Sequence, residues 1–75
     1  MTNQLKKWRE KLNYSQMELS VAAKISPATV VSIEKYGYLP GPYVRFKIAK
    51  TMNLSESVIW PGTEVQEVAV DGNNR

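Results

Sequence analysis

Two helix-start signals lie close together in the first half of the chain, and they constrain its fold more than any other feature. Ser15 and Glu18 have the spacing of a capping box, in which each side chain bonds the backbone N–H of the other residue. Ser26 followed by Pro27 is a helix N-cap with proline at the first helical position. A helix that begins at Ser15 must therefore end near Lys24, and a second helix follows it after a tight turn.

Apolar residues recur at helical spacing on both sides of this pair, which predicts an all-α fold. Two prolines and two glycines between residues 36 and 42 predict a loop there, with Gly37 as the cap of the preceding helix. Helices are expected over residues 4–13, 15–24, 27–35, 43–52 and 55–60. Their inner residues are expected to be Leu5, Trp8, Leu12, Met17, Leu19, Ala23, Val30, Ile33, Val44, Ile48, Ala49 and Met52.

The length and residue types exclude several classes of protein. A chain of 75 residues holds one small core, so a single domain is expected. Cysteine and histidine are both missing, so we expect no disulfide, no metal site and no cofactor. An enzyme is not expected either, because the scattered carboxylates form no evident catalytic set. The apolar stretches are too short for a membrane helix or a signal peptide, which favours a cytoplasmic protein without membrane contact.

Charge is unevenly divided along the chain. Residues 1–60 carry nine Lys and Arg against four Glu, or +5, whereas residues 61–75 carry one Arg against three acidic residues, or −2. A basic body is typical of nucleic-acid binding, although a solvated lysine-rich face is the simpler alternative. The acidic tail, residues 61–75, is expected to be flexible and disordered, with a short strand as the alternative.

Four fragments follow one another in a characteristic order and spacing. They are Ser15-Gln16-Met17-Glu18-Leu19, Ile25-Ser26-Pro27-Ala28-Thr29-Val30, Ile33-Glu34-Lys35 and Ile48-Ala49-Lys50. Together they resemble the Xre family of lambda-repressor-like, Cro-type helix-turn-helix transcriptional regulators, over about residues 5–60. The resemblance implies a compact five-helix DNA-binding domain that binds double-stranded DNA as a repressor. It places the third helix in the major groove. A homodimer on DNA is also expected, because a dimer doubles the bases that are read.

The resemblance also implies which residues contact DNA. Gln16 opens the second helix, where its amide and the helix N-terminus can bind a phosphate; the alternative is an exposed first-turn residue without a ligand. The recognition positions fall on Pro27, Ala28, Val31 and Ser32, with Thr29 beside them. The complete set expected to contact DNA is Gln16, Lys24, Ser26, Pro27, Ala28, Thr29, Val31, Ser32, Lys35, Tyr36 and Tyr38.

These recognition residues are unusually poor in hydrogen-bonding groups. Proline, alanine and valine cannot form the paired hydrogen bonds by which Arg reads guanine or Asn and Gln read adenine. We therefore expect methyl contacts to thymine from Ala28 and Val31, hydroxyl bonds from Thr29 and Ser32, and a contribution from DNA shape. Val31 has a second interpretation, as a partly buried core residue.

Two further features follow from the resemblance, and a third follows from the residues of the loop. Arg9 and Glu34 match a structural ion pair that bridges the first and third helices of the family. Lys24 replaces the usual turn glycine, so a left-handed backbone at a lysine is expected there, at a cost of about 1 kcal/mol. The loop tyrosines 36, 38 and 43, with Lys35 and Arg45 nearby, suit either phosphate contacts or ordinary ring packing.

Two alternatives concern protein partners. The same fold serves antitoxins and recombination accessory factors, which act through protein–protein contacts, here through residues 61–75. A further alternative is a domain of this fold that has lost DNA binding altogether.

For the dimer, three consecutive apolar residues, Val58, Ile59 and Trp60, predict a contact surface at the end of the fifth helix. Trp60 as a wholly internal residue is the other interpretation.

Overall fold

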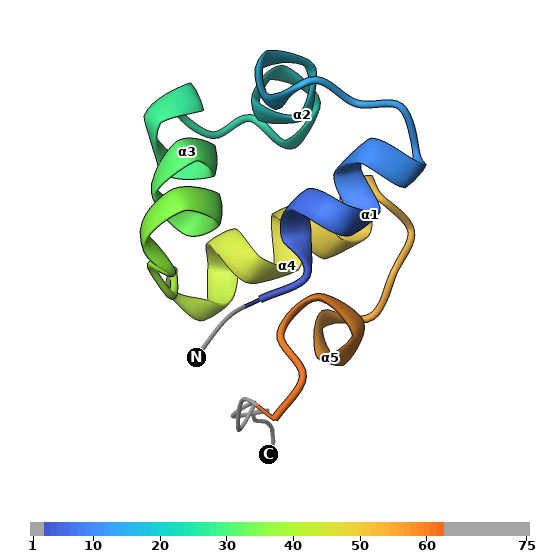
Figure 1. Cartoon of the computed structure of the whole chain (residues 1–75), viewed down its shortest axis with the longest axis vertical. Coiled ribbons are helices and arrows are strands. Elements are labelled where there is room, and N and C mark those ends of the chain that lie inside the picture. Colours follow the sequence, from blue (N-terminus) through green and yellow to red (C-terminus); the bar gives the residue numbers. More distant parts are fainter. Residues whose placement is uncertain (1–2, 63–75) are drawn as a thin grey trace.

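The computed structural model describes residues 3–62, which fold into five helices (Figure 1). These are α1 (Leu5–Lys11), α2 (Gln16–Ala23), α3 (Pro27–Tyr36), α4 (Pro42–Thr51) and α5 (Glu56–Ile59). No strand occurs within this range, so the all-α class and the order of five helices are confirmed. The expectation of a disordered or extended segment after residue 62 falls outside the described residues.

The helix-start signals are present as expected. The backbone N–H of Glu18 donates to Ser15 Oγ at 2.9 Å, and the N–H of Ser15 donates to Glu18 Oε1 at 2.8 Å, which completes the capping box of α2. Ser26 Oγ accepts the N–H of Ala28 at 3.1 Å and so caps α3. The expected loop over residues 36–42 is one residue too long at each end. Tyr36 is the last residue of α3, and Pro42 is the first residue of α4, where its missing N–H costs nothing.

Each of the four longer helices is followed by a residue with left-handed backbone. These residues are Asn13, Lys24, Gly37 and Asn53. Glycine and asparagine adopt this conformation with little strain. Lys24, with φ 60° and ψ 49°, confirms the expected left-handed turn between α2 and α3. Its backbone N–H donates to the Ser20 and Val21 carbonyls, which offsets part of the cost by closing the end of α2.

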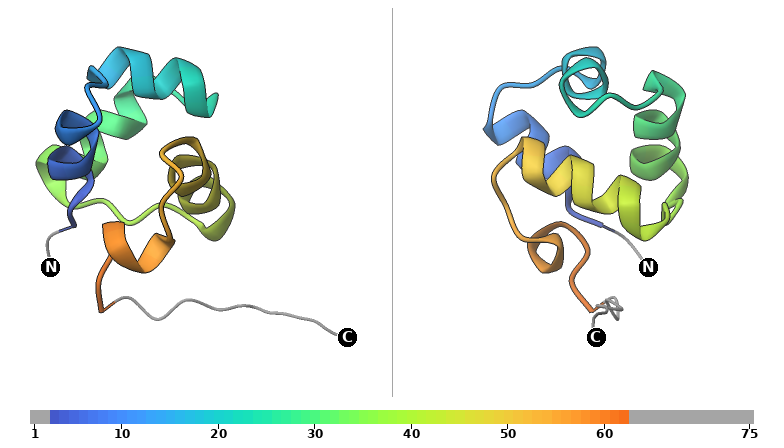
Figure 2. Two further views of the ribbon diagram at one scale, coloured as in Figure 1. Left: turned by 90° about the vertical axis from the view of Figure 1, so that its right-hand side faces the viewer. Right: turned by 180° about the vertical axis from the view of Figure 1, so that it is seen from behind.

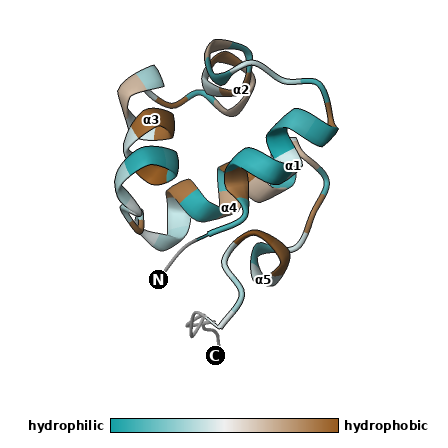
Figure 3. Ribbon diagram, in the orientation of Figure 1, coloured by the Kyte–Doolittle hydropathy of each residue, from teal (hydrophilic) through white to brown (hydrophobic). Residues whose placement is uncertain are grey.

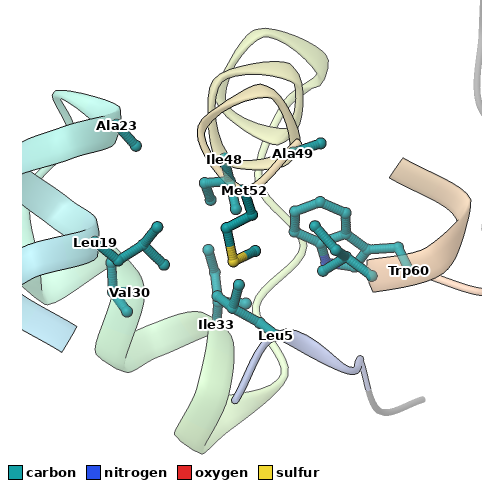
Figure 4. Packing of buried hydrophobic residues seen from close by; sticks show 10 residues of the cluster. Leu5, Leu19, Ala23, Val30, Ile33, Ile48, Ala49, Met52 and Trp60 are labelled. Atoms are coloured by element: carbon teal, nitrogen blue, oxygen red, sulfur yellow. The ribbon is translucent and has the colours of Figure 1, made fainter. Parts of the chain in front are cut away.

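The helices surround a single core of apolar side chains. Helix α2 packs against α3 and α4, α1 packs against α3, and α5 packs against α4, as the views in Figure 2 show from two further sides. The core residues are Leu5, Leu19, Ala23, Val30, Ile33, Ile48, Ala49, Met52, Ile59 and Trp60 (Figure 4). The start of the chain is tied to α5 by a hydrogen bond from the Gln4 N–H to the Ile59 carbonyl at 2.7 Å.

Two residues expected in the core are exposed instead. Leu12 lies beyond the last residue of α1 as its C-cap, so the helical period no longer directs it inward. Met17 and Leu19 are two positions apart, which is about 200° around a helix, and only Leu19 points inward. Most residues of helix α1 are hydrophilic, as the colouring of Figure 3 shows.

The end of α5 is not a free apolar surface. Ile59 is completely buried and Trp60 nearly so, and both belong to the core, whereas Val58 alone is exposed. The expected dimer surface over these three residues is therefore wrong, and the internal interpretation of Trp60 holds. In residues 3–62 no helix is both long and apolar enough to span a membrane.

Candidate nucleic-acid interface

The outer face of α3 is left free by the packing of the other helices. Val30 and Ile33 point into the core, and Ala28, Ser32 and Tyr36 follow one another at intervals of four residues on the opposite side. Helix α3 therefore presents a row of small side chains that ends in an exposed aromatic ring. A helix of this kind, held by a short turn to the helix before it, has the geometry of a reading helix.

An open hollow of about 350 Å³ lies along this row. It is lined by Ala28, Thr29, Ser32, Tyr36 and Tyr38. Gly37 reverses the chain with its left-handed backbone, and the Tyr38 N–H then donates to the Ser32 carbonyl at 3.2 Å. This bond holds Tyr38 beside α3, so that five of the eleven residues expected to contact DNA are brought together.

Gln16 lies at the start of α2, and its side chain has a partner within the protein. Its Nε2 donates to Glu34 Oε1 at 3.1 Å. An amide NH₂ group has two donor hydrogens, so one remains for an external ligand while the other fixes the side chain. The first-turn N–H groups of α2 lie beside it, and that of Glu18 is already taken by Ser15.

Glu34 connects Gln16 to a second, stronger contact. Arg9 Nε donates to Glu34 Oε2 at 2.6 Å and Arg9 Nη2 donates to Glu34 Oε1 at 3.0 Å, in the paired geometry that Arg forms with carboxylates. The two side chains are only 9% and 4% exposed. The hydrogen bonds that Arg9 donates to Glu34 raise the pKa of Arg9 above its ordinary value. Arg9 also donates to the Tyr14 carbonyl at 2.7 Å, and the pair thus joins α1 to α3.

The other expected contact residues are spread around this centre. Ser26 and Pro27 are exposed at the start of α3, and Val31 is half-buried outside the hollow. Lys35 is exposed, with its ammonium 5.6 Å from the centre of the Tyr36 ring. Lys24 lines a different depression, between α2 and α4.

Arg45 is not free to contact phosphate. It is buried, its Nη1 donates to the Pro40 carbonyl at 2.6 Å, and its Nε lies 3.4 Å from Glu56 Oε1. The guanidinium therefore fastens the loop and α5 to α4. Its suggested role near DNA is wrong, because its charge is already used inside the fold.

An exposed aromatic and cationic surface on α4 was missed by the reasoning from sequence. The Lys47 ammonium lies 4.8 Å from the Tyr43 ring centre, and that of Lys50 lies 5.7 Å from the Phe46 ring centre. Lys47 also donates to the Lys24 carbonyl at 3.0 Å. The clue in the sequence was the spacing of each aromatic–lysine pair, four residues, which places the two side chains on one helical face.

The arrangement offers binding surfaces and no evident catalytic chemistry. Across residues 3–62, no three His, Cys, Asp or Glu side chains gather where they could hold a metal ion. The face of α3, the N-terminus of α2 and the basic charge around them define a helix-turn-helix protein.

Comparison with known proteins shows the family. Residues 5–59 match the family described as "Helix-turn-helix". The chain is 34% identical over 61 residues to an uncharacterized HTH-type transcriptional regulator, YgzD, of Bacillus subtilis (strain 168), with 80% of this chain and 92% of that protein covered. The chain belongs to the Xre-type, lambda-repressor-like helix-turn-helix family, which consists of DNA-binding regulators and not of enzymes.

Proposed function

We propose that the protein is a sequence-specific, double-stranded DNA-binding repressor of transcription that places α3 in the major groove. The outward row on α3 carries this proposal, since Ala28 and Ser32 in this row are small enough to let the helix approach the base edges closely. The Bacillus relative is named as a transcriptional regulator, which supports the same function. Residues 1–60 form the DNA-binding domain in this proposal, and residues 61–75 form a separate acidic tail.

Phosphate contacts supply most of the affinity in this account. Gln16 and the N-terminus of α2 bind one phosphate, and the exposed Lys35 lies close to the end of α3. Because Pro27, Ala28 and Val31 form no paired hydrogen bonds with bases, one domain discriminates weakly between sequences. The protein therefore acts as a homodimer on two half-sites about one helical turn apart.

Gln16→Ala tests how α2 lies on DNA. The variant loses one hydrogen bond to a phosphate, so its affinity is expected to fall about tenfold, and by the same factor on every duplex. Fluorescence anisotropy with several labelled duplexes measures this. Met17→Ala, an exposed neighbour in the same turn, serves as the matched control and is expected to change little. Unchanged affinity of Gln16→Ala on all duplexes would show that α2 does not approach the phosphates.

A protein-binding role, as in an antitoxin, is the second candidate. The observation that favours it is the exposed pair Tyr43 and Phe46 on α4, because exposed aromatic rings are common at protein interfaces. In that case the variants Tyr43→Ala and Phe46→Ala would abolish partner binding and leave DNA affinity unaltered.

A further inference from the structure

The chemistry of the hollow on α3 differs from that of an ordinary reading helix. It is lined in part by Ala28, Thr29 and Ser32, whose side chains carry a methyl group, a methyl and a hydroxyl group, and a hydroxyl group, respectively. Hydroxyl groups both donate and accept, so they pair with any base and discriminate poorly. The methyl groups are the one selective element, and they select an apolar partner.

Two tyrosines, Tyr36 and Tyr38, complete the lining of the hollow. Tyr36 is 72% exposed and Tyr38 is 52% exposed, yet both line the same hollow. Their backbone positions are fixed by the end of α3 and by the hydrogen bond from the Tyr38 N–H to the Ser32 carbonyl. The Lys35 ammonium lies near the Tyr36 ring and keeps positive charge beside it. An exposed aromatic ring with a polar hydroxyl tip is suited to contact an apolar group in polar surroundings.

The major-groove edge of DNA offers one apolar group, the 5-methyl of thymine. We infer that the hollow of Ala28, Thr29, Ser32, Tyr36 and Tyr38 receives thymine 5-methyl groups, and that Tyr36 and Tyr38 are specificity residues. This inference rests on the proposed function, since it requires α3 to lie in the major groove. Cytosine carries hydrogen at the same ring position, so it cannot make this apolar contact with the residues of the hollow.

The size of the effect follows from the burial of a single methyl group. Burying one such group contributes about fourfold to an equilibrium constant. Each thymine that enters the hollow is therefore expected to contribute about fourfold to affinity.

The experiment replaces thymine by uracil, which removes the methyl group and keeps the base pair. A duplex is first selected from random-sequence DNA by binding to the full chain. It is then synthesised with uracil at each thymine in turn, and Kd is measured at constant salt. A loss of about fourfold at one or two clustered positions supports the inference. At those positions a G·C pair is also tested with cytosine and with 5-methylcytosine, and the methylated form is expected to bind more tightly.

Protein variants connect the effect to the hollow. In Thr29→Ser and Tyr38→Ser, replacing thymine by uracil at the clustered positions is expected to change Kd little. The thymine methyl group has already lost its contact with the protein in these variants. Tyr43→Ser is the matched control, since Tyr43 is 70% exposed and lies outside the hollow; it should keep the full penalty. If base-pair changes alter Kd but uracil at every position leaves it unchanged, the methyl inference is wrong and the DNA-binding function stands. If no duplex binds, both fail together.

Discussion

Glu34→Ala is expected to lower the free energy of unfolding by about 3–5 kcal/mol. The substitution leaves the Arg9 guanidinium in a site that is 9% exposed, with the Tyr14 carbonyl as its remaining close partner. Small domains are stable by only about 5–15 kcal/mol, so the variant should be partly unfolded at 37 °C. Urea denaturation followed by circular dichroism measures the loss.

Glu10→Ala provides the matched control for this result. Glu10 Oε2 lies 3.9 Å from Arg9 Nη2, and its side chain is 58% exposed, so water already screens the contact. Its loss is expected to cost less than about 1 kcal/mol. Equal effects of the two substitutions would contradict a structural role of the Arg9–Glu34 pair.

Ile59→Asp is expected to prevent folding. The Ile59 side chain is completely buried in the core, and an aspartate there would place a carboxylate among apolar groups without a compensating charge. We expect a loss of at least about 4 kcal/mol, seen as missing helical circular dichroism and a collapsed amide NMR spectrum.

Val58→Asp is the matched control, because it introduces the same charge into α5 at an exposed position. Val58 is the exposed neighbour of Ile59, so this variant should fold with a melting temperature close to that of the parent chain. A folded Ile59→Asp protein would mean that the end of α5 is a surface after all, as the three consecutive apolar residues first suggested.

Local signals made much of this fold predictable. The capping box of Ser15 and Glu18, the Ser26-Pro27 start and the Gly37 cap each act within four residues of their own position. Such short-range interactions can be predicted from sequence alone, and they located the boundaries of α2 and α3. The family resemblance then pointed to Arg9 and Glu34, which lie far apart along the chain.

Features that depend on distant contacts were not predictable in the same way. The environment of Ile59 is set by the core around it and by the Gln4 N–H that bonds its carbonyl. Arg45 looked like a surface cation because its partners, Pro40 and Glu56, belong to a loop and a separate helix. Tyr38 differs from these two, since it is held beside α3 by a bond to Ser32 only six residues earlier and was among the expected DNA contacts.

The affinity of the protein for DNA is expected to depend steeply on salt. A basic domain that draws its affinity from phosphates releases counterions on binding, so log K falls linearly with log salt, by about 0.9 for each phosphate neutralised. With about four such contacts, the affinity of the full chain for a duplex should fall about a hundredfold between roughly 50 and 200 mM salt. An affinity that stays constant over this range would contradict DNA binding through the basic helix-turn-helix surface.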